Sequence, residues 1–205
     1  MIDFEYAARH LRGIWQLAAD NEDWREEMDL TLDGVFRSLW AIFLALPFSL
    51  LGFTAAARAI AQTPEYPRTM FSKAPLGVLL GLEVLTMVGA WFISIAILAF
   101  TARRIGASKQ AAGLIVTFNW SQLFGGMVAT IPALGLIATG SLEIFATLAI
   151  PSLIFSLFLI WSVVRKTLAA DVGVTVAILA VIIAAELGVN SAITSGGIWV
   201  YQLLS

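Results

Sequence analysis

The chain contains five long apolar segments separated by short polar or charged stretches. A helix of about 20 predominantly apolar residues crosses a hydrocarbon layer about 30 Å thick. The segments that reach this length are approximately Leu39–Ile60, Leu76–Thr101, Ala111–Leu136, Phe145–Val164 and Val172–Ile193. The sequence therefore predicts an all-α integral membrane protein with about five transmembrane helices.

The composition supports lipid as the solvent of this chain. Hydrophobic residues make up 60% of the 205 residues and charged residues only 13%, and the mean hydropathy is +0.89. An ordinary soluble domain is about half apolar and about one quarter charged. A water-soluble core of this size could not hide so much apolar surface.

Residue types that bind metals or carry catalysis are scarce. Cysteine is absent, which excludes disulfides, iron–sulfur clusters and thiolate metal sites. The single histidine, His10, does not build a metal site by itself, and no phosphate-binding glycine loop or HExxH motif is present. We therefore expect a protein that is not an enzyme and that has no cofactor and no nucleic-acid partner.

The charges divide the chain into three parts. Nine of the 14 carboxylates lie between Asp3 and Asp33. We expect residues 1–36 to form cytoplasmic or interfacial amphipathic helices, residues 37–194 the transmembrane bundle, and residues 195–205 a short interfacial tail. The first long apolar run begins only near Ser38, so we interpret it as a retained span and not as a cleavable signal.

An amphipathic helix is predicted at residues 3–19. Charged side chains such as Arg9 and Arg12 fall largely away from an apolar stripe at helical spacing, which consists of Phe4, Ala7, Ala8, Leu11, Ile14, Trp15 and Ala18. Two placements are consistent with this pattern. The helix lies in the headgroup layer of the membrane, or it packs on the protein's own cytoplasmic face.

A second helix is predicted to begin after Asp20-Asn21, which offers an N-cap. Its apolar stripe leads into the first span and contains Trp24, Met28, Leu32 and Val35. The acidic residues between Glu22 and Asp33 form a solvated helix face or bind a basic partner. Four aromatic residues are candidate membrane-interface anchors: Trp15, Trp24, Trp199 and Tyr201.

The basic residues predict the orientation of the bundle. With the N-terminus in the cytoplasm, nine basic residues fall on the inner side: Arg9, Arg12, Arg25, Arg37, Arg103, Arg104, Lys109, Arg165 and Lys166. Only Arg58, Arg68 and Lys73 fall outside. This positive-inside bias predicts a C-terminus outside. The layout, without a long polar N-terminal extension, favours a bacterial inner membrane.

Polar residues within the spans form the candidate functional site. Counted from the span boundaries at about 1.5 Å per residue, Glu83 and Glu186 fall in nearly the same layer of the outer half of the bilayer. Gln122 reaches a similar height, Asn119 lies slightly deeper, and Asn190 lies nearer the outer surface. Arg58 has a stem long enough to reach this layer.

Two interpretations of these carboxylates follow. Either Glu83 and Glu186 face a polar cavity that binds a proton, a cation or a basic head group, with Gln122 and Asn119 as neutral ligands. Or each carboxyl group is protonated, or hydrogen-bonds to a neighbouring helix or to Arg58, and stabilises the bundle.

Two stretches resemble the Yip family of five-span membrane proteins, whose eukaryotic members interact with Rab-type GTPases. One is RRIGASKQAAGLIVTFNW at Arg103–Trp120, followed by Ile131-Pro132; the other is FLIWSVVRKTLAADVGVTVAILAVIIAAEL at Phe158–Leu187. The resemblance implies a five-span fold of bacterial type and a role in membrane organisation or as a partner-binding scaffold. It implies no catalytic residues.

The sequence thus favours a non-enzymatic membrane scaffold or accessory subunit, in contact with the lipid bilayer and in a homo- or hetero-oligomer with a membrane protein. The alternative is a small transporter or channel for protons, cations or solutes that uses Glu83 and Glu186.

Overall fold

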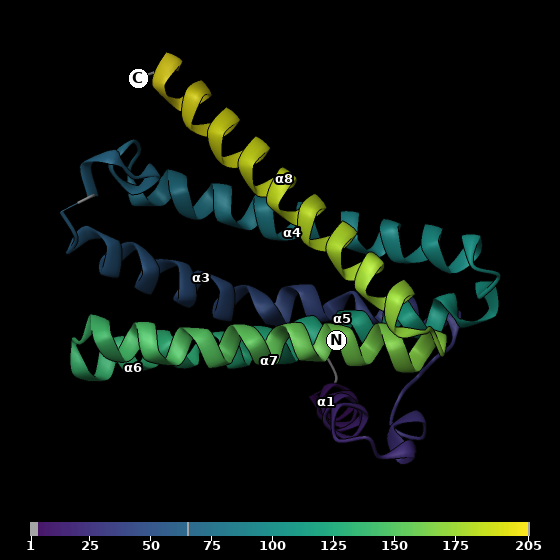
Figure 1. Cartoon of the computed structure of the whole chain (residues 1–205). Helices are drawn as coiled ribbons and strands as arrows, with labels where there is room; N and C mark the ends of the chain where they lie inside the picture. The colour runs from purple at the N-terminus through teal and green to yellow at the C-terminus, as the bar shows by residue number, and fades with distance from the viewer. Residues whose placement is uncertain (1–3, 65, 205) are drawn as a thin grey trace.

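The computed structural model describes residues 4–64 and 66–204 and contains five helices or helix pairs that are long and apolar enough to cross a membrane. The predicted all-α fold with five spans is confirmed, and no strand occurs in the described residues. The spans lie alongside one another (Figure 1). They are α3 (Trp40–Ala61), α4 (Leu76–Arg104), α5 with α6 (Ala111–Ala129 and Ile131–Thr139), α7 (Leu142–Leu168) and α8 (Val172–Leu204).

The third span is two helices and not the single helix that its apolar length suggests. α5 ends at Ala129 and α6 begins at Ile131, with Pro132 in its first turn. Proline has no N–H to donate to the carbonyl four residues earlier, so it is tolerated in a first turn and interrupts a longer helix. Gly140, in the left-handed region at φ 67°, then ends α6.

The N-terminal region differs in part from the prediction. α1 (Phe4–Ala18) is the expected amphipathic helix, but the second helix is wrong: η1 (Glu22–Arg25) is a single 3₁₀ turn, and helix resumes only at α2 (Leu32–Ser38). Asp29 accepts hydrogen bonds from the N–H and the hydroxyl of Thr31, and the Thr31 hydroxyl in turn caps Gly34 N–H. Such local side-chain bonds compete with the helical pattern.

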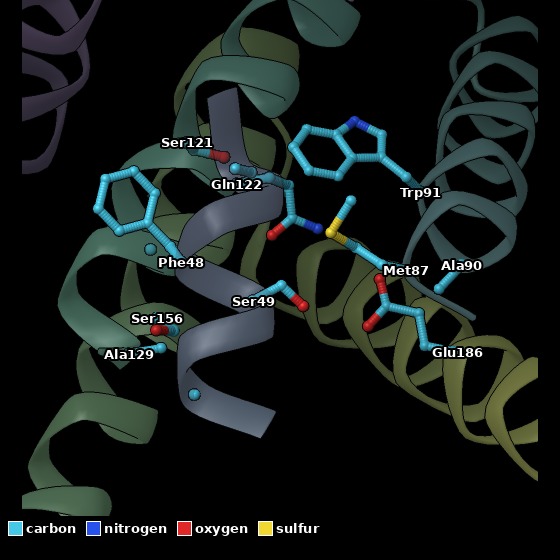
Figure 2. A pocket seen from close by; sticks show the side chains of 14 residues that line it. Phe48, Ser49, Met87, Ala90, Trp91, Ser121, Gln122, Ala129, Ser156 and Glu186 are labelled. Atoms are coloured by element: carbon cyan, nitrogen blue, oxygen red, sulfur yellow. The ribbon is translucent and has the colours of Figure 1, made fainter. Parts of the chain in front are cut away.

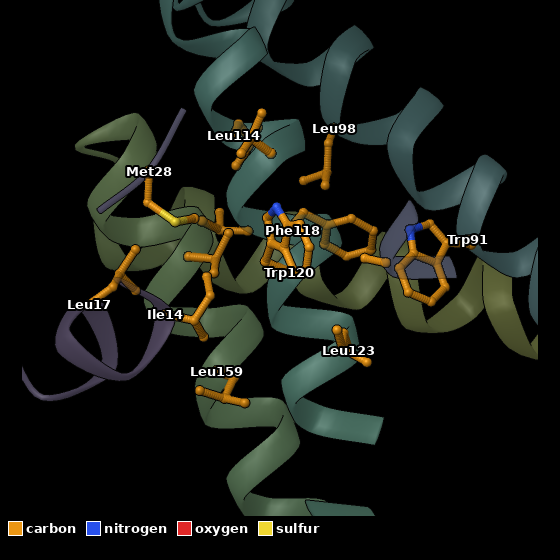
Figure 3. Packing of buried hydrophobic residues seen from close by; sticks show 14 of the residues in the cluster. Ile14, Leu17, Met28, Trp91, Leu98, Leu114, Phe118, Trp120, Leu123 and Leu159 are labelled. Carbon is orange, nitrogen blue, oxygen red and sulfur yellow. The ribbon is translucent and has the colours of Figure 1, made fainter. Parts of the chain in front are cut away.

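α1 packs against the side of the bundle, crossing below α5 and α7 where it is seen nearly end-on (Figure 1). Ile14 and Leu17 are completely buried there. Figure 3 shows these residues packed in one cluster with Trp120 and Phe118 of α5 and Leu159 of α7. Of the two predicted placements, α1 therefore has its main apolar face on the protein, whereas Phe4 and Trp15 remain exposed.

The fifth span and the C-terminal segment form one helix. α8 continues without interruption through Leu204, so residues 195–204 are a continuation of the span and not the expected separate tail. α8 crosses α4 obliquely in Figure 1. Glycines bring the two helices close, because a Cβ on Gly89 would meet Val189 and Ile193, and one on Gly197 would meet Leu82.

Candidate intramembrane binding site

A partly open cavity of about 360 Å³ lies between α3, α4, α5, α7 and α8. Side chains from facing helices converge on it in Figure 2. The walls combine apolar and aromatic groups with a few hydroxyls, one amide and one carboxyl group. The lining residues are Ala45, Phe48, Ser49, Gly52, Met87, Ala90, Trp91, Ser121, Gln122, Gly125, Gly126, Ala129, Ser156 and Glu186.

Glu186 is the one acidic residue that lines this cavity. Ser94 of α4 donates a hydrogen bond of 2.7 Å to its Oε1. No basic residue lines the cavity, and no ion pair among the described residues involves Glu186. The carboxyl group thus has a hydrogen-bond donor but no cation beside it.

Gln122, the other predicted residue in this cavity, lies across from Glu186 on α5 (Figure 2). Within the described residues its amide makes no hydrogen bond to the protein, while the serine hydroxyls around it are occupied by other groups. Ser121 and Ser156 donate to backbone carbonyls of their own helices. Gln122 therefore offers a carbonyl and an NH₂ group that are free to bind a guest.

Glu83 does not share a site with Glu186. It accepts a hydrogen bond of 2.7 Å from Ser49 of α3, and Ser49, not Glu83, lines the cavity. Ser94, the partner of Glu186, lies eleven residues beyond Glu83 along α4, which corresponds to about 16 Å of helix. The expectation that the two carboxylates occupy one layer is therefore wrong.

Asn119 has a different role from the predicted one. It is completely buried, accepts a hydrogen bond of 2.8 Å from Trp91 Nε1, and donates one of 2.8 Å to Ser38 Oγ. These bonds connect α5 with α4 and α2. They also hold the Trp91 indole in the cavity wall, so Asn119 positions a lining residue without lining the cavity itself.

Asn190 and Arg58 lie apart from the cavity. Asn190 is exposed and accepts a hydrogen bond from Thr194 one turn further along α8. Arg58 is exposed at the outer end of α3, where it lines two other hollows, one beside α6 and one beside the loop before α4. The described residues show no ion pair between Arg58 and Glu83.

The four predicted interface anchors differ in their exposure. Trp15 and Trp199 are 55% and 62% exposed, as an anchor requires, and Tyr201 is half-buried. Trp24 is only 2% exposed, because it packs into the cluster beneath α1 with the Arg25 guanidinium over its ring. The expectation that Trp24 anchors the membrane interface is therefore wrong.

Sequence inspection missed the hydroxyl partners of the two carboxylates and a buried histidine. Ser49 and Ser94 carry no sequence signal beyond lying within apolar spans. His10 is completely buried, with Nδ1 2.8 Å from the Tyr6 carbonyl and Nε2 accepting a 3.0 Å hydrogen bond from Asp29 N–H. Burial lowers the pKa of His10 and, together with Asp29, raises the pKa of Tyr6 to about 12.

The described part of the chain contains no cluster of three or more His, Cys, Asp or Glu side chains placed to hold a metal ion. Comparison of the chain with models of protein families, with curated proteins and with solved structures finds no match.

Proposed function

We propose that this chain is a non-enzymatic membrane scaffold or accessory subunit of Yip-like type that acts by binding another membrane protein through α8. One observation carries the proposal. A continuous face of α8 consists entirely of small residues, spaced three and four apart and all exposed: Gly173, Ala177, Ala180, Ala184, Gly188, Ser191 and Ser195.

The physical reason is the nature of helix association in lipid. Apolar side chains are as well solvated by lipid as by protein, so helices associate through close backbone approach and dispersion contacts. Small residues permit that approach, and a face of this kind is typical of a helix–helix interface. Within the chain, α8 packs mainly on α4, through Gly89 of α4 and Gly197 of α8, and this packing leaves the small-residue face uncovered.

Gly188→Leu tests this proposal. A Cβ at Gly188 meets no atom within 4 Å, so the variant is expected to fold normally. The leucine side chain would hold a partner helix away, and we expect the cross-linked oligomer in native membranes to fall at least severalfold. Ala146→Leu, at an exposed position of α7, is the matched control. A wild-type protein recovered only as a monomer without any partner would contradict the proposal.

We also propose that the chain resides in a bacterial inner membrane with its N-terminus in the cytoplasm and its C-terminus outside. The support for this orientation is the distribution of basic residues, nine on the side of the N-terminus and three on the other side. Four of the nine lie in the last turns of α4 and α7, and Lys109 lies in the α4–α5 connection.

A second candidate is a small proton, cation or solute transporter, favoured by the carboxyl group of Glu186 in the cavity. Intramembrane carboxylates without a basic partner commonly mark substrate or proton pathways. Flux of protons and cations into proteoliposomes tests this candidate. Flux that is unchanged in both Glu83→Gln and Glu186→Gln would exclude it.

A further inference from the structure

We propose that the cavity binds a small organic cation with a primary ammonium group, held by Glu186 and Gln122. This inference goes beyond the scaffold function and specifies a ligand class for the second candidate. The proposal concerns binding only, so its test does not depend on whether the chain transports the ligand.

Charge is the first argument. A carboxyl group withdrawn from water either keeps its proton or pairs with a cation, because its isolated ionised form is very costly in a low-dielectric interior. Ser94 supplies one hydrogen bond to Glu186, and the cavity lining supplies no positive charge. A bound ammonium group provides the missing charge and donates up to three hydrogen bonds.

The distribution of hydrogen-bonding groups is the second argument. An ammonium group is a donor only, and it requires acceptors that are not already occupied. Apart from Glu186, the Gln122 carbonyl is such an acceptor, since this amide makes no hydrogen bond within the described residues. The two residues lie on α8 and α5, on different sides of the same cavity in Figure 2.

The remaining walls define the body of the ligand. Phe48 and Trp91 present aromatic rings and Met87 a polarizable thioether, while Gly52, Gly125 and Gly126 line the cavity without side chains. Aromatic faces attract cations, and a thioether adapts to irregular apolar shapes. A volume of about 360 Å³ falls at the lower end of the range for small-molecule sites. These features favour a compact aliphatic amine over a bare inorganic ion.

The test is binding of n-butylammonium to the purified full chain in lipid nanodiscs, measured by titration calorimetry, with butan-1-ol as the uncharged analogue. We expect saturable binding of the ammonium and only non-saturable partitioning of the alcohol. In Glu186→Gln, which keeps an oxygen acceptor for Ser94, affinity should fall at least tenfold, as it does when one partner of a buried charge pair is removed. Glu143→Gln, at an exposed carboxyl group in the first turn of α7, is the control and should bind normally.

A second variant distinguishes a specific loss of ligand binding from a loss of binding caused by misfolding. Gly126 lines the cavity, and a Cβ there meets no atom within 4 Å, so Gly126→Leu is expected to fill the cavity without displacing a neighbour. This variant should abolish n-butylammonium binding while retaining the thermal unfolding of the wild type. Equal partitioning of ammonium and alcohol in the wild type, or undiminished affinity in Glu186→Gln or in a folded Gly126→Leu, would overturn the proposal.

Discussion

His10 links three segments at the residue scale. Because its Nε2 accepts the Asp29 N–H, the proton of the neutral ring lies on Nδ1 and is donated to the Tyr6 carbonyl. The ring also contacts the rings of Tyr6 and Trp120 in tilted arrangements, at centroid distances of 4.0 and 5.1 Å. A second proton on Nε2 would abolish the bond to Asp29 and place a charge in a buried site.

The docking of α1 should therefore depend on pH. Burial lowers the pKa of His10 below its ordinary value of about 6.5, although the hydrogen bond to the Tyr6 carbonyl and the charges of Asp29 and Glu27 partly oppose this effect and Arg9 adds to it. The undocked state then binds more protons, so the stability of docking is complete above about pH 6.5 and declines as the pH falls below it, by up to about 1.4 kcal/mol per pH unit.

A spin label at the exposed position Ala8→Cys measures this effect, since the chain has no other cysteine. We expect label mobility to rise between pH 7 and pH 5, before Asp29 titrates, because hydrogen bonds from Thr31 lower the pKa of that carboxyl group. The rise should be absent in a His10→Gln background. A spectrum of the otherwise unmodified chain that does not change over this interval would contradict the prediction.

Among the elements, α1 is held at its C-terminal end by α7. Lys166 donates a 2.6 Å hydrogen bond to the Leu17 carbonyl and forms an ion pair of 2.6 Å with Asp20. Asp20 itself has a positive φ of 64°, just beyond the helix end. The ammonium group thus satisfies a terminal carbonyl of α1 and interacts favourably with the negative end of its dipole. The hydrogen bond from Lys166 also lowers the pKa of Asp20.

Lys166→Met should weaken the docking of α1 without altering the bundle. Methionine retains an apolar stem but no donor, and a hydrogen bond that involves a charged group contributes about 1.5–3 kcal/mol. Because solvent still reaches the Lys166 ammonium group, whose side chain is 24% exposed, we expect the lower end of this range and an increase in α1 amide exchange of roughly tenfold. Lys166→Arg should restore most of the protection. Equal exchange in Lys166→Met and in the wild type would show that apolar packing alone holds α1.

For the whole molecule, helix length and charge together set the position in the bilayer. α4 has 29 residues and α8 has 33, which correspond to about 43 and 50 Å and exceed the hydrocarbon thickness of about 30 Å. Both helices must therefore tilt or extend into the headgroup region. α8 crosses α4 obliquely, which is consistent with tilt.

Single cysteines determine the orientation, because the native chain has none. Gln62→Cys, after α3, should react with a membrane-impermeant maleimide in intact spheroplasts. Ser108→Cys, between α4 and α5, should react only after the membrane is opened. Both positions are exposed, so reactivity reports the side of the membrane. The reverse pattern would contradict a cytoplasmic N-terminus.

Some local features could be predicted from the sequence and others could not. Pro132 marks the break between α5 and α6, but composition alone did not show that the flanking residues would separate into two helices. Residues 26–31 form a loop because Thr31 donates hydrogen bonds to the Asp29 side chain, and local bonds of this kind compete with helix formation. The burial of Trp24 depends on α1 covering it, which is a long-range contact.

Two residues of the candidate site were predicted correctly, but the positions of the polar side chains relative to one another were not. Glu186 and Gln122 do line one cavity. Glu83 was assigned to the same depth by counting residues from each boundary, as though every helix ran straight across the bilayer. The oblique crossing and the register of α4 against α8, seen in the contacts of Gly89 and Gly197, place Glu186 beside Ser94 instead.

The order of residues along the chain was enough to predict five helices that are long and apolar enough to cross a membrane, and an amphipathic charged helix before them. Both are properties of consecutive residues, because segment length and helical periodicity depend only on the order along the chain. Which intramembrane polar groups meet could be seen only in the folded molecule. Those meetings depend on the tilt, rotation and register of each helix, which packing between distant segments sets.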